Sequence, residues 1–406
     1  MSDKNASTSP LTGSATSKPS IPRDKQNDHT QSMAQQRRDF IQQQTNAELT
    51  HVGHYSLSPE QTAGNIENFI GVAQVPIGLA GPIKVNGEHA KGEFYVPLAT
   101  TEGTLVASYN RGMRVLGAAG GVKVTVVDDA MQRAPVFIFE DARQAHAFGI
   151  WINEQLASIK NEAQSTTSVG KLRNIEQYAA ARMLYLRFNF TTGDAAGQNM
   201  VGKATFAACE WIKANYPGQG MQRYNLSGAM DTDKKHSQLN TLHTRGKRVI
   251  AEAKISNDIL KSMLGVSAEM LFKMRQVSNM GSFMAGSINN GSHSANGITA
   301  MFIACGQDAA NVAESSAALS FVDVDEQGNF YIAITLPSLI VATYGGGTAL
   351  ATQKECLEMM DCCGEGKAHK LAEIIGATVL AGEWSLSAAV LAGDWVTSHD
   401  ALGRNR

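Results

Sequence analysis

The chain has 406 residues, of which 43% are hydrophobic and 18% are charged, and its formal net charge at pH 7 is −2. A chain of this length buries a large core and divides into about two or three domains. The near-zero net charge argues against nucleic acid and against an anionic membrane surface as partners. No run of about 18 residues is apolar throughout, so we expect no membrane-spanning segment.

Cysteine usage and the N-terminus bear on location and on metal binding. The five cysteines are an odd number, and their spacing does not match that of metal ligands. The opening residues lack the basic and then apolar pattern of a secretory signal. We therefore expect a reducing, cytoplasmic location and no metal site.

The predicted elements begin after a polar tail. Residues 1–33 carry almost no large apolar side chains, so we expect a disordered tail there. An N-terminal helical segment is predicted in 34–64, and apolar residues recur at helical spacing from 102 to 116.

The middle of the chain alternates short apolar strands with helices. Strands are expected at 122–127, 136–139, 183–190 and 221–226, and helices at 141–163 and from the T-T-G-D turn to 216. This order predicts an α+β protein in which a small domain, 135–226, is inserted into a large domain made of 65–134 and 227–390.

The large domain is expected to be built around one long central helix. Residues 295–319 are rich in Ala, Ser and Gly and apolar on nearly every side, as a central helix requires. A hairpin at 321–336 and a helical region at about 367–391 follow. The last residues, 391–406, are expected to form a C-terminal flap.

Two isolated acids are candidates for proton transfer. Glu102 lies in P-L-A-T-T-E-G-T-L-V-A-S and Asp308 in I-A-C-G-Q-D-A-A-N, both among small or apolar residues. A buried carboxyl is costly to ionise, which favours giving and taking protons near neutral pH. The alternatives are a helix-dipole acid at Glu102 and a structurally satisfied acid at Asp308.

The basic candidates are a lysine pair and two histidines. Lys234 and Lys235, in D-T-D-K-K, could bind an anion and stabilise an oxyanion, although a solvated loop is the alternative. His399 lies eight residues from the C-terminus and could protonate a leaving group from a mobile flap or be idle in a frayed tail. His293 could meet a thioester or phosphate, or be a satisfied polar group.

Two glycine-rich turns could receive phosphate groups. T-T-G-D-A-A-G-Q-N-M (191–200) passes from strand to helix, and Y-G-G-G-T (344–348) is a second small-residue loop. Neither G-x-G-x-x-G nor the P-loop pattern occurs in the chain. A dinucleotide would therefore be held in another way than in a Rossmann site.

Eight collinear segments carry a family resemblance over residues 65–404. They are E-N-F-I-G-V-A-Q-V-P-I-G-L-A-G-P, P-L-A-T-T-E-G-T-L-V-A-S-Y-N-R-G, T-G-D-A-A-G-Q-N-M, D-T-D-K-K, H-S-A-N-G-I-T-A, I-A-C-G-Q-D-A-A, L-P-S-L-I-V-A-T-Y-G-G-G-T and A-G-E-W-S-L-S-A-A-V-L-A-G. In this order they resemble the soluble catalytic portion of class I 3-hydroxy-3-methylglutaryl-CoA (HMG-CoA) reductases. The resemblance implies reduction of HMG-CoA to mevalonate and CoA with two NAD(P)H, in the pathway that leads to isoprenoids.

The resemblance also implies roles for particular residues. It makes four of them catalytic: Glu102, Lys234, Asp308 and His399. It places around the hydroxymethylglutaryl group Arg133, Ser227, Asp233, Lys235 and Asn296, and around CoA Ser108, Asn110, Arg111 and His293. It places along the nicotinamide cofactor Asp194, Gly197, Asn199, Gln307, Gly345, Gly346, Gly347 and Arg404.

The architecture that the resemblance implies is a ferredoxin-like small domain for the dinucleotide and sites built across a dimer interface, commonly within a homotetramer. NADPH is expected more than NADH. Three departures stand out. Thr167, Ser168 and Val169 replace a Ser-Arg-Phe segment that meets the 2′-phosphate, although Lys171 could substitute. Ala229 replaces an asparagine and Ile340 a glutamate.

Other functions stay open on the sequence. One is the degradative direction, in which mevalonate is oxidised to HMG-CoA with NAD; the departure at 167–169 is the reason to keep it. A catalytically silent CoA-binding protein would need a broken catalytic quartet, and here the quartet is whole. A cysteine-dependent thioester hydrolase is weaker, because no cysteine has an adjacent histidine.

Overall fold

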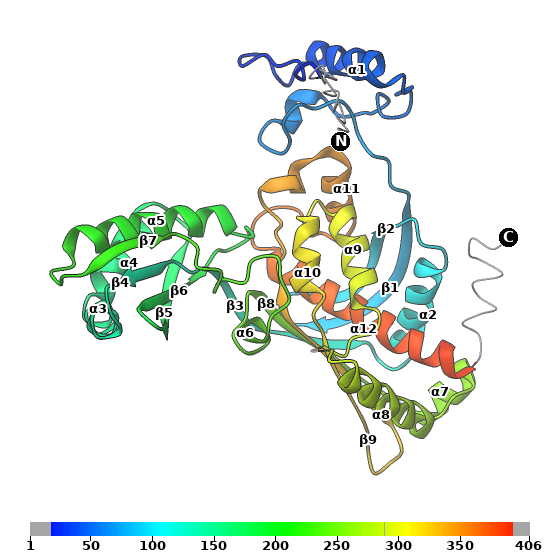
Figure 1. The fold of residues 1–406 in the computed structure, drawn as a ribbon. Helices are drawn as coiled ribbons and strands as arrows, with labels where there is room; N and C mark the ends of the chain where they lie inside the picture. Colours follow the sequence, from blue (N-terminus) through cyan, green and yellow to red (C-terminus); the bar gives the residue numbers. More distant parts are fainter. Residues whose placement is uncertain (1–17, 288, 393–406) are drawn as a thin grey trace, which may run out of the picture. The chain divides into compact units, whose positions relative to one another are not determined.

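The computed structural model describes residues 18–287 and 289–392, and the chain divides into two compact units between Gln74 and Val75 (Figure 1). The first unit holds α1 (Gln31–Thr45) and the short 3-10 helix η1 (Pro59–Thr62). α1 begins at Thr30, whose hydroxyl accepts a hydrogen bond from the backbone N–H of Met33.

Two buried arginines of α1 organise the first unit. Arg37 donates to the carbonyl of Pro22 and pairs with the carboxylate of Asp28, and Arg38 donates to the carbonyl of Ile70 at 2.7 Å. A guanidinium offers five donors and so can order backbone that has few apolar side chains. Polar contacts of this kind are not visible as an apolar pattern in the sequence.

These contacts correct two expectations at the N-terminus. The predicted disordered tail, 1–33, is too long, because α1 begins at Gln31 and Asp28 is held by Arg37. Residues 65–74 were expected in the large domain, but they belong to the first unit.

The second unit is built on a long sheet whose strands are mostly antiparallel. The strands of its larger half follow the order β2 (Lys91–Ala99), β1 (Ile77–Gly87), β3 (Val122–Arg133), β8 (Gly246–Ile255), β10 (Phe330–Leu339) and β9 (Leu319–Val324). Only β1 and β3 in this row are parallel. The end of β3, at 131–133, pairs with β6 (Met183–Thr191), so one strand joins both halves of the sheet.

The smaller half has its own order and its own core. Along the chain it contains β4 (Val136–Phe139), α3 (Ala142–Glu154), α4 (Leu156–Ser165), β5 (Lys171–Ala180), β6, α5 (Gln198–Asn215) and β7 (Met221–Asn225). In space the strands lie in the antiparallel order β7, β4, β6, β5. Buried aromatic side chains, among them Phe137, Phe148 and Phe188, form a core separate from that of the larger half.

The predicted strands at 136–139, 183–190 and 221–226 are confirmed, but β5 was not expected. Among the described strands β5 pairs only with β6, and it carries many charged and amide side chains, so it has no continuous apolar face to reveal it. The predicted helix 141–163 is divided into α3 and α4 at Gln155.

Helices pack on the larger half of the sheet. They are α2 (Leu105–Ala118), α6 (Gln238–Leu242), α7 (Asn257–Leu264), α8 (Ala268–Met284), α9 (Ser294–Ala304), η2 (Ala309–Asn311), α10 (Val312–Ser315), η3 (Gly346–Ala349), α11 (Ala351–Met359) and α12 (Ala368–Ala392). α12 contacts β3, β8 and β10 as well as α2 and α9.

One helix in the described part of the chain, α12, is long and apolar enough to cross a membrane, with a mean hydropathy of 1.6. However, 78% of that stretch is buried inside the fold. α12 is therefore read as the long core helix of this unit.

The central helix expected at 295–319 is wrong. α9 ends at Ala304, and Gly306 follows with φ +66°. A Cβ on Gly306 would lie 2.2 Å from the carbonyl oxygen of Gly347, so this close backbone approach requires glycine. The apolar run belongs to two short buried helices and the start of β9, which periodicity cannot distinguish from one buried helix.

Candidate active site

An ion pair joins two loops of the second unit. Lys234 lies between β7 and α6, and its Nζ is 2.9 Å from Oδ2 of Asp308. Asp308 caps η2, since its Oδ1 accepts a hydrogen bond from the backbone N–H of Ala310 at 3.0 Å. The hydrogen bond to Asp308 raises the pKa of Lys234 above its ordinary value. Lys234 is thus held in its charged form.

Asp308 differs from the expectation of a charge buried in a helix. It lies after α9, and its side chain is 41% exposed, beside a Lys234 side chain that is 43% exposed. Its acceptors are satisfied by the lysine and by the helix cap, so its charge has partners on both oxygens.

The backbone around Lys234 is strained. Lys234 has φ +56° and Thr232 has φ +50°, in the left-handed region that side chains other than glycine rarely adopt. Such residues persist when surrounding contacts over-determine them, and they concentrate at functional sites. Here the contacts are made by buried charged residues that pack against the loop.

A buried charge network holds this loop. Arg245 is fully buried and donates to Oδ1 of Asp233 at 2.6 Å and to Oε2 of Glu314 at 3.1 Å. One guanidinium cannot fully compensate two carboxylates, and burial raises the pKa of Glu314 to about 7. The carboxylate of Asp233 is therefore engaged within the chain. Lys235 donates from Nζ to the backbone carbonyl of Asp233 at 3.0 Å.

Glu102 is paired with Asn296, at the beginning of α9. The Asn296 Nδ2 group donates to both carboxylate oxygens of Glu102, at 3.0 and 2.9 Å. Glu102 was expected to be buried, but in the single chain it is exposed, in the turn between β2 and α2. Asn296 lies in the first turn of α9 and Asp308 follows the end of this helix, so one segment contributes to both polar pairs.

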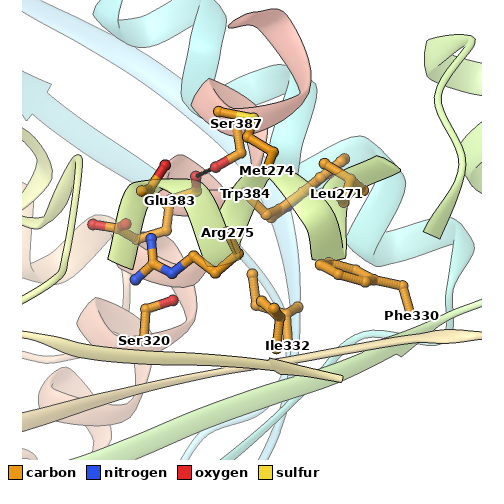
Figure 2. A pocket seen from close by; sticks show the side chains of 11 residues that line it. Leu271, Met274, Arg275, Ser320, Phe330, Ile332, Glu383, Trp384 and Ser387 are labelled. Carbon is orange, nitrogen blue, oxygen red and sulfur yellow. Dashed lines mark hydrogen bonds between the residues drawn. The ribbon is translucent and has the colours of Figure 1, made fainter. Parts of the chain in front are cut away.

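The start of α9 is anchored from below by a residue that the sequence did not reveal. Glu383 of α12 is 2% exposed and accepts hydrogen bonds from the backbone N–H groups of Ser292 and His293, at 2.7 and 2.6 Å. Glu383 of α12 and Arg275 of α8 line a small cavity of about 20 Å³ (Figure 2). Arg275 donates to the carbonyl of Asn290, so the loop before α9 is held from two sides.

Two of the residues assigned to the CoA side contact α12. Arg111 donates to the hydroxyl and to the carbonyl oxygen of Ser385, both at 3.0 Å, and this hydroxyl donates to the carbonyl of Ser108 at 2.8 Å. Asn110 accepts a hydrogen bond from the backbone N–H of Gly81 at 2.8 Å. His293 is buried against Tyr109, and burial lowers its pKa to about 4.

Arg111 also lines a surface pocket of about 460 Å³. Lys261, in the last turn of α7, lies on the same pocket and brings a second cation to it. Lys261 has no distinguishing signal in the sequence, because a single basic residue at the end of a helix is a common capping feature.

Several residues assigned to the cofactor lie on adjoining segments. The backbone carbonyl of Asp194 accepts from Thr343 and Tyr344, and its carboxylate accepts from Gly366 and Ala368. The side-chain amide of Gln307 donates a hydrogen bond to the carbonyl of Ala342 and accepts one from the backbone N–H of the same residue. The turns at 192–197, 306–307 and 343–347 therefore converge, with Gly345, Gly346 and Gly347 in the last of them.

Gly197 begins α5 with φ +85°, and a Cβ there would lie 2.2 Å from the side chain of Thr192. This turn leaves the first backbone N–H groups of an 18-residue helix uncovered by side-chain caps. Asn199, the second residue of α5, is exposed at this end of the helix. The residues present suit an anionic cofactor.

The remaining residues to which the resemblance gives a role are Arg133, Ser227, His399 and Arg404. Arg133 pairs with the buried Asp231 at 2.9 Å, which was not anticipated, and its buried Nε has no partner. Ser227 is exposed. His399 and Arg404 lie outside the described residues, as does the predicted flap beyond Ala392. Among the described residues, no group of three His, Cys, Asp or Glu could hold a metal ion.

A lysine paired with an aspartate, a glutamate bound by an amide, and a glycine turn at a helix start are features of the class of proteins whose sites suit acid–base chemistry on an anionic substrate. The sequence comparisons identify the family. The hydroxymethylglutaryl-coenzyme A reductase family model matches residues 33–404. The chain belongs to the hydroxymethylglutaryl-coenzyme A reductase family.

Known relatives cover nearly the whole chain. This chain is 43% identical over 376 residues to 3-hydroxy-3-methylglutaryl-coenzyme A reductase of Pyrococcus abyssi. The aligned region covers 91% of this chain and 92% of that protein. This chain is also 44% identical over 373 residues to the protein of the same name from Methanocaldococcus jannaschii, with 91% and 92% covered.

A solved structure shares the fold. It is the class II 3-hydroxy-3-methylglutaryl-CoA reductase from Streptococcus pneumoniae bound to NADPH, with a TM-score of 0.66 and 22% identity over 88% of this chain and 97% of that one. At this identity the likeness concerns the mixed α/β fold with its antiparallel sheet.

Proposed function

We propose that the protein reduces HMG-CoA to mevalonate and CoA, with two molecules of NAD(P)H. The single observation that carries this proposal is the Lys234–Asp308 pair, which keeps an ammonium group charged on a strained loop of a chain that belongs to this family. Family membership over residues 33–404 supports the reductive direction.

Each residue of the site has a task in this reaction. Bound NAD(P)H supplies one hydride in each of the two reductions. Lys234 stabilises the oxyanion that forms when the thioester carbonyl is reduced to a thiohemiacetal, and Asp308 keeps the lysine protonated. His399 protonates the CoA thiolate as the C–S bond breaks. Glu102, oriented by Asn296, donates the proton that completes the alcohol when the aldehyde is reduced.

The smaller half of the sheet is proposed as a ferredoxin-like dinucleotide domain. Its β-α-β-β-α-β order and the strand order β7, β4, β6, β5 support this assignment. The turn at Gly197 would hold the pyrophosphate at the start of α5, near Asp194 and Gln307.

NADPH is the proposed cofactor, with Lys171 as the cation for its 2′-phosphate. Lys171 is exposed at the start of β5, while the hydroxyl of Thr167 is engaged with the backbone of Val169 and Gly170. Because no arginine lies in this turn, mevalonate oxidation with NAD stays the second candidate function.

The pocket beside Arg111 is proposed for the anionic part of CoA. Arg111 and Lys261 line it together, and two cations in one concave site suit phosphate groups.

We also propose a homo-oligomer based on dimers. One face of α8 exposes Met270, Val277, Met280, Phe283 and Met284, at helical spacing, with Phe283 and Met284 each 80% exposed. A continuous apolar stripe of this kind is typical of an interface between subunits. A dimer-based tetramer would cover it and complete sites that are open in the single chain.

Class I membership is proposed because the catalytic segments resemble that class and because identity with the class II structure is only 22%, against 43% and 44% with the two archaeal relatives. A reducing, cytoplasmic location is proposed because all five cysteines are free.

The reaction is tested with purified protein, HMG-CoA, and NADPH or NADH at equal concentrations. We expect reduced cofactor to be consumed, two molecules for each mevalonate formed, and faster with NADPH. The absence of turnover with both cofactors would contradict the proposal. A faster reaction from mevalonate, NAD and CoA would favour the degradative direction.

A further inference from the structure

Gln198 connects the start of α5 with both loops of the Lys234–Asp308 pair. It is the first residue of α5 and is partly buried. Its Nε2 group donates to Oδ1 of Asp233 at 3.2 Å and to Oδ1 of Asn311 at 2.9 Å. Asp233 immediately precedes Lys234, and Asn311 is the last residue of the turn that Asp308 caps.

The first of these bonds bears on the strained loop. Asp233 lies between Thr232 and Lys234, the two left-handed residues. Its Oδ1 receives the Arg245 guanidinium from the core side and the Gln198 amide from α5. Two donors on one oxygen fix the carboxylate from two directions, and with it the backbone that presents Lys234.

The second bond bears on the aspartate. Asn311 is 1% exposed, and its backbone N–H donates to the carbonyl of Asp308 at 3.0 Å. A group that holds the Asn311 side chain therefore also holds the turn that carries Asp308. Gln198 is that group.

An amide suits this place chemically. Its NH₂ group carries two hydrogens and can serve two acceptors at once. A carboxylate here would face the Asp233 carboxylate with like charge, and a thioether would have no donor.

We propose that Gln198 is a positioning residue that sets the geometry of the Lys234–Asp308 pair from the start of α5. The inference rests on the proposed function, in which this end of α5 receives the dinucleotide. The start of α5 and the Lys234–Asp308 pair are then mechanically coupled. A shift at the start of the helix changes the position of the lysine that stabilises the oxyanion.

The main test replaces Gln198 by Met, which keeps the length of the side chain and removes both hydrogen bonds. We expect kcat to fall about tenfold or more, because a small displacement of a catalytic group is costly. The KM for HMG-CoA should change little, because the loss falls mainly on the transition state. The matched control is Gln177→Met: Gln177 Nε2 also donates twice, to the carbonyl of Gly149 and to Asn153, within the smaller half of the sheet. This control should keep the kcat of the unchanged protein.

A second variant, Gln198→Glu, gives a readout that a merely structural role would not. At neutral pH the introduced carboxylate repels Asp233, so kcat should fall further than in Gln198→Met. As the pH is lowered, protonation restores one donor, and the ratio of its kcat to that of the unchanged protein should rise. Gln198→Met should show no such rise.

Hydrogen exchange separates this inference from the proposed function, because it needs no turnover. The peptide covering 229–236 should exchange faster in Gln198→Met than in the unchanged protein or in Gln177→Met. Inactivity of the unchanged protein would defeat the proposed function and leave this readout intact. Equal exchange, or a kcat equal to that of the unchanged active protein, would overturn the positioning role.

Discussion

At the scale of single residues, the site depends on how charges are partnered. The carboxylate of Asp308 accepts a hydrogen bond from Lys234 and raises the pKa of the lysine, which favours its charged form. The pair is partly exposed, so solvent reaches it in the single chain and the effect is moderate. The direction of the shift nevertheless sets how the reaction responds to pH.

The substitution Asp308→Asn tests this dependence. An amide cannot stabilise the ammonium as a carboxylate does, so the pKa of Lys234 should fall toward its ordinary value. Activity that requires the charged lysine is lost as the pH rises through that pKa, so the alkaline limit of the pH profile of kcat should move to lower pH. A drop in kcat of about a hundredfold is also expected.

The measurement is the pH profile of kcat in both proteins, with Asp323→Asn as control, because Asp323 lies on β9 and its Oδ1 accepts a hydrogen bond from the backbone N–H of its neighbour Val324. An alkaline limit that stayed in place in Asp308→Asn would contradict the account of Lys234.

At the scale of elements, the loop that carries Asp308 exists because α9 ends where two backbones touch. Gly306 has a left-handed conformation, and Gly347 lies against it. A side chain at Gly306 would separate the 306–307 turn from the 343–347 turn. The same contact therefore ends the helix and holds together two segments assigned to the cofactor site.

We expect Gly306→Ala to destabilise the protein by about 2 kcal/mol or more, since it adds a clash of the Cβ with backbone to the left-handed strain. Gly328→Ala is the matched control: Gly328 has φ +78°, but a Cβ there meets nothing within 4 Å. The control should lose only about 1 kcal/mol. Urea unfolding of both variants gives the comparison, and equal losses would show that the contact with Gly347 is unimportant.

At the scale of the whole molecule, α8 has two unlike faces. Leu271 and Arg275 lie on its buried face, whereas Val277, Phe283 and Met284 lie on its exposed face. Exposed apolar side chains cost free energy in water, so the proposed association of copies through this face would remove that cost. The open surroundings of Glu102 and Lys234 in the single chain are consistent with a site completed by a neighbouring subunit.

The substitution Phe283→Glu should lower the molar mass in solution measured by light scattering, and activity should fall with it. Phe206→Glu is the control, because Phe206 is 50% exposed on α5, outside the α8 stripe. An unchanged mass for Phe283→Glu would exclude this face of α8 as the interface.

The sequence by itself determines much of the local structure. The strand at 136–139, the glycine turn at 197, the D-T-D-K-K loop and the long helix from 368 have signals within a few neighbouring residues, in periodicity or in turn chemistry. Motifs in their order along the chain also indicated the family, because they combine many short signals that rarely coincide.

Burial and pairing could not be read in this way. Glu102 lies among small and apolar residues in the sequence yet is exposed, and Asp308 follows a helix instead of lying within one. The role of Gln198 depends on its hydrogen bonds to Asp233 and Asn311, which are distant in sequence. These properties come from contacts between segments distant along the chain. A side chain's solvent and partners are set by what folds against it, and neighbouring residues carry little record of that.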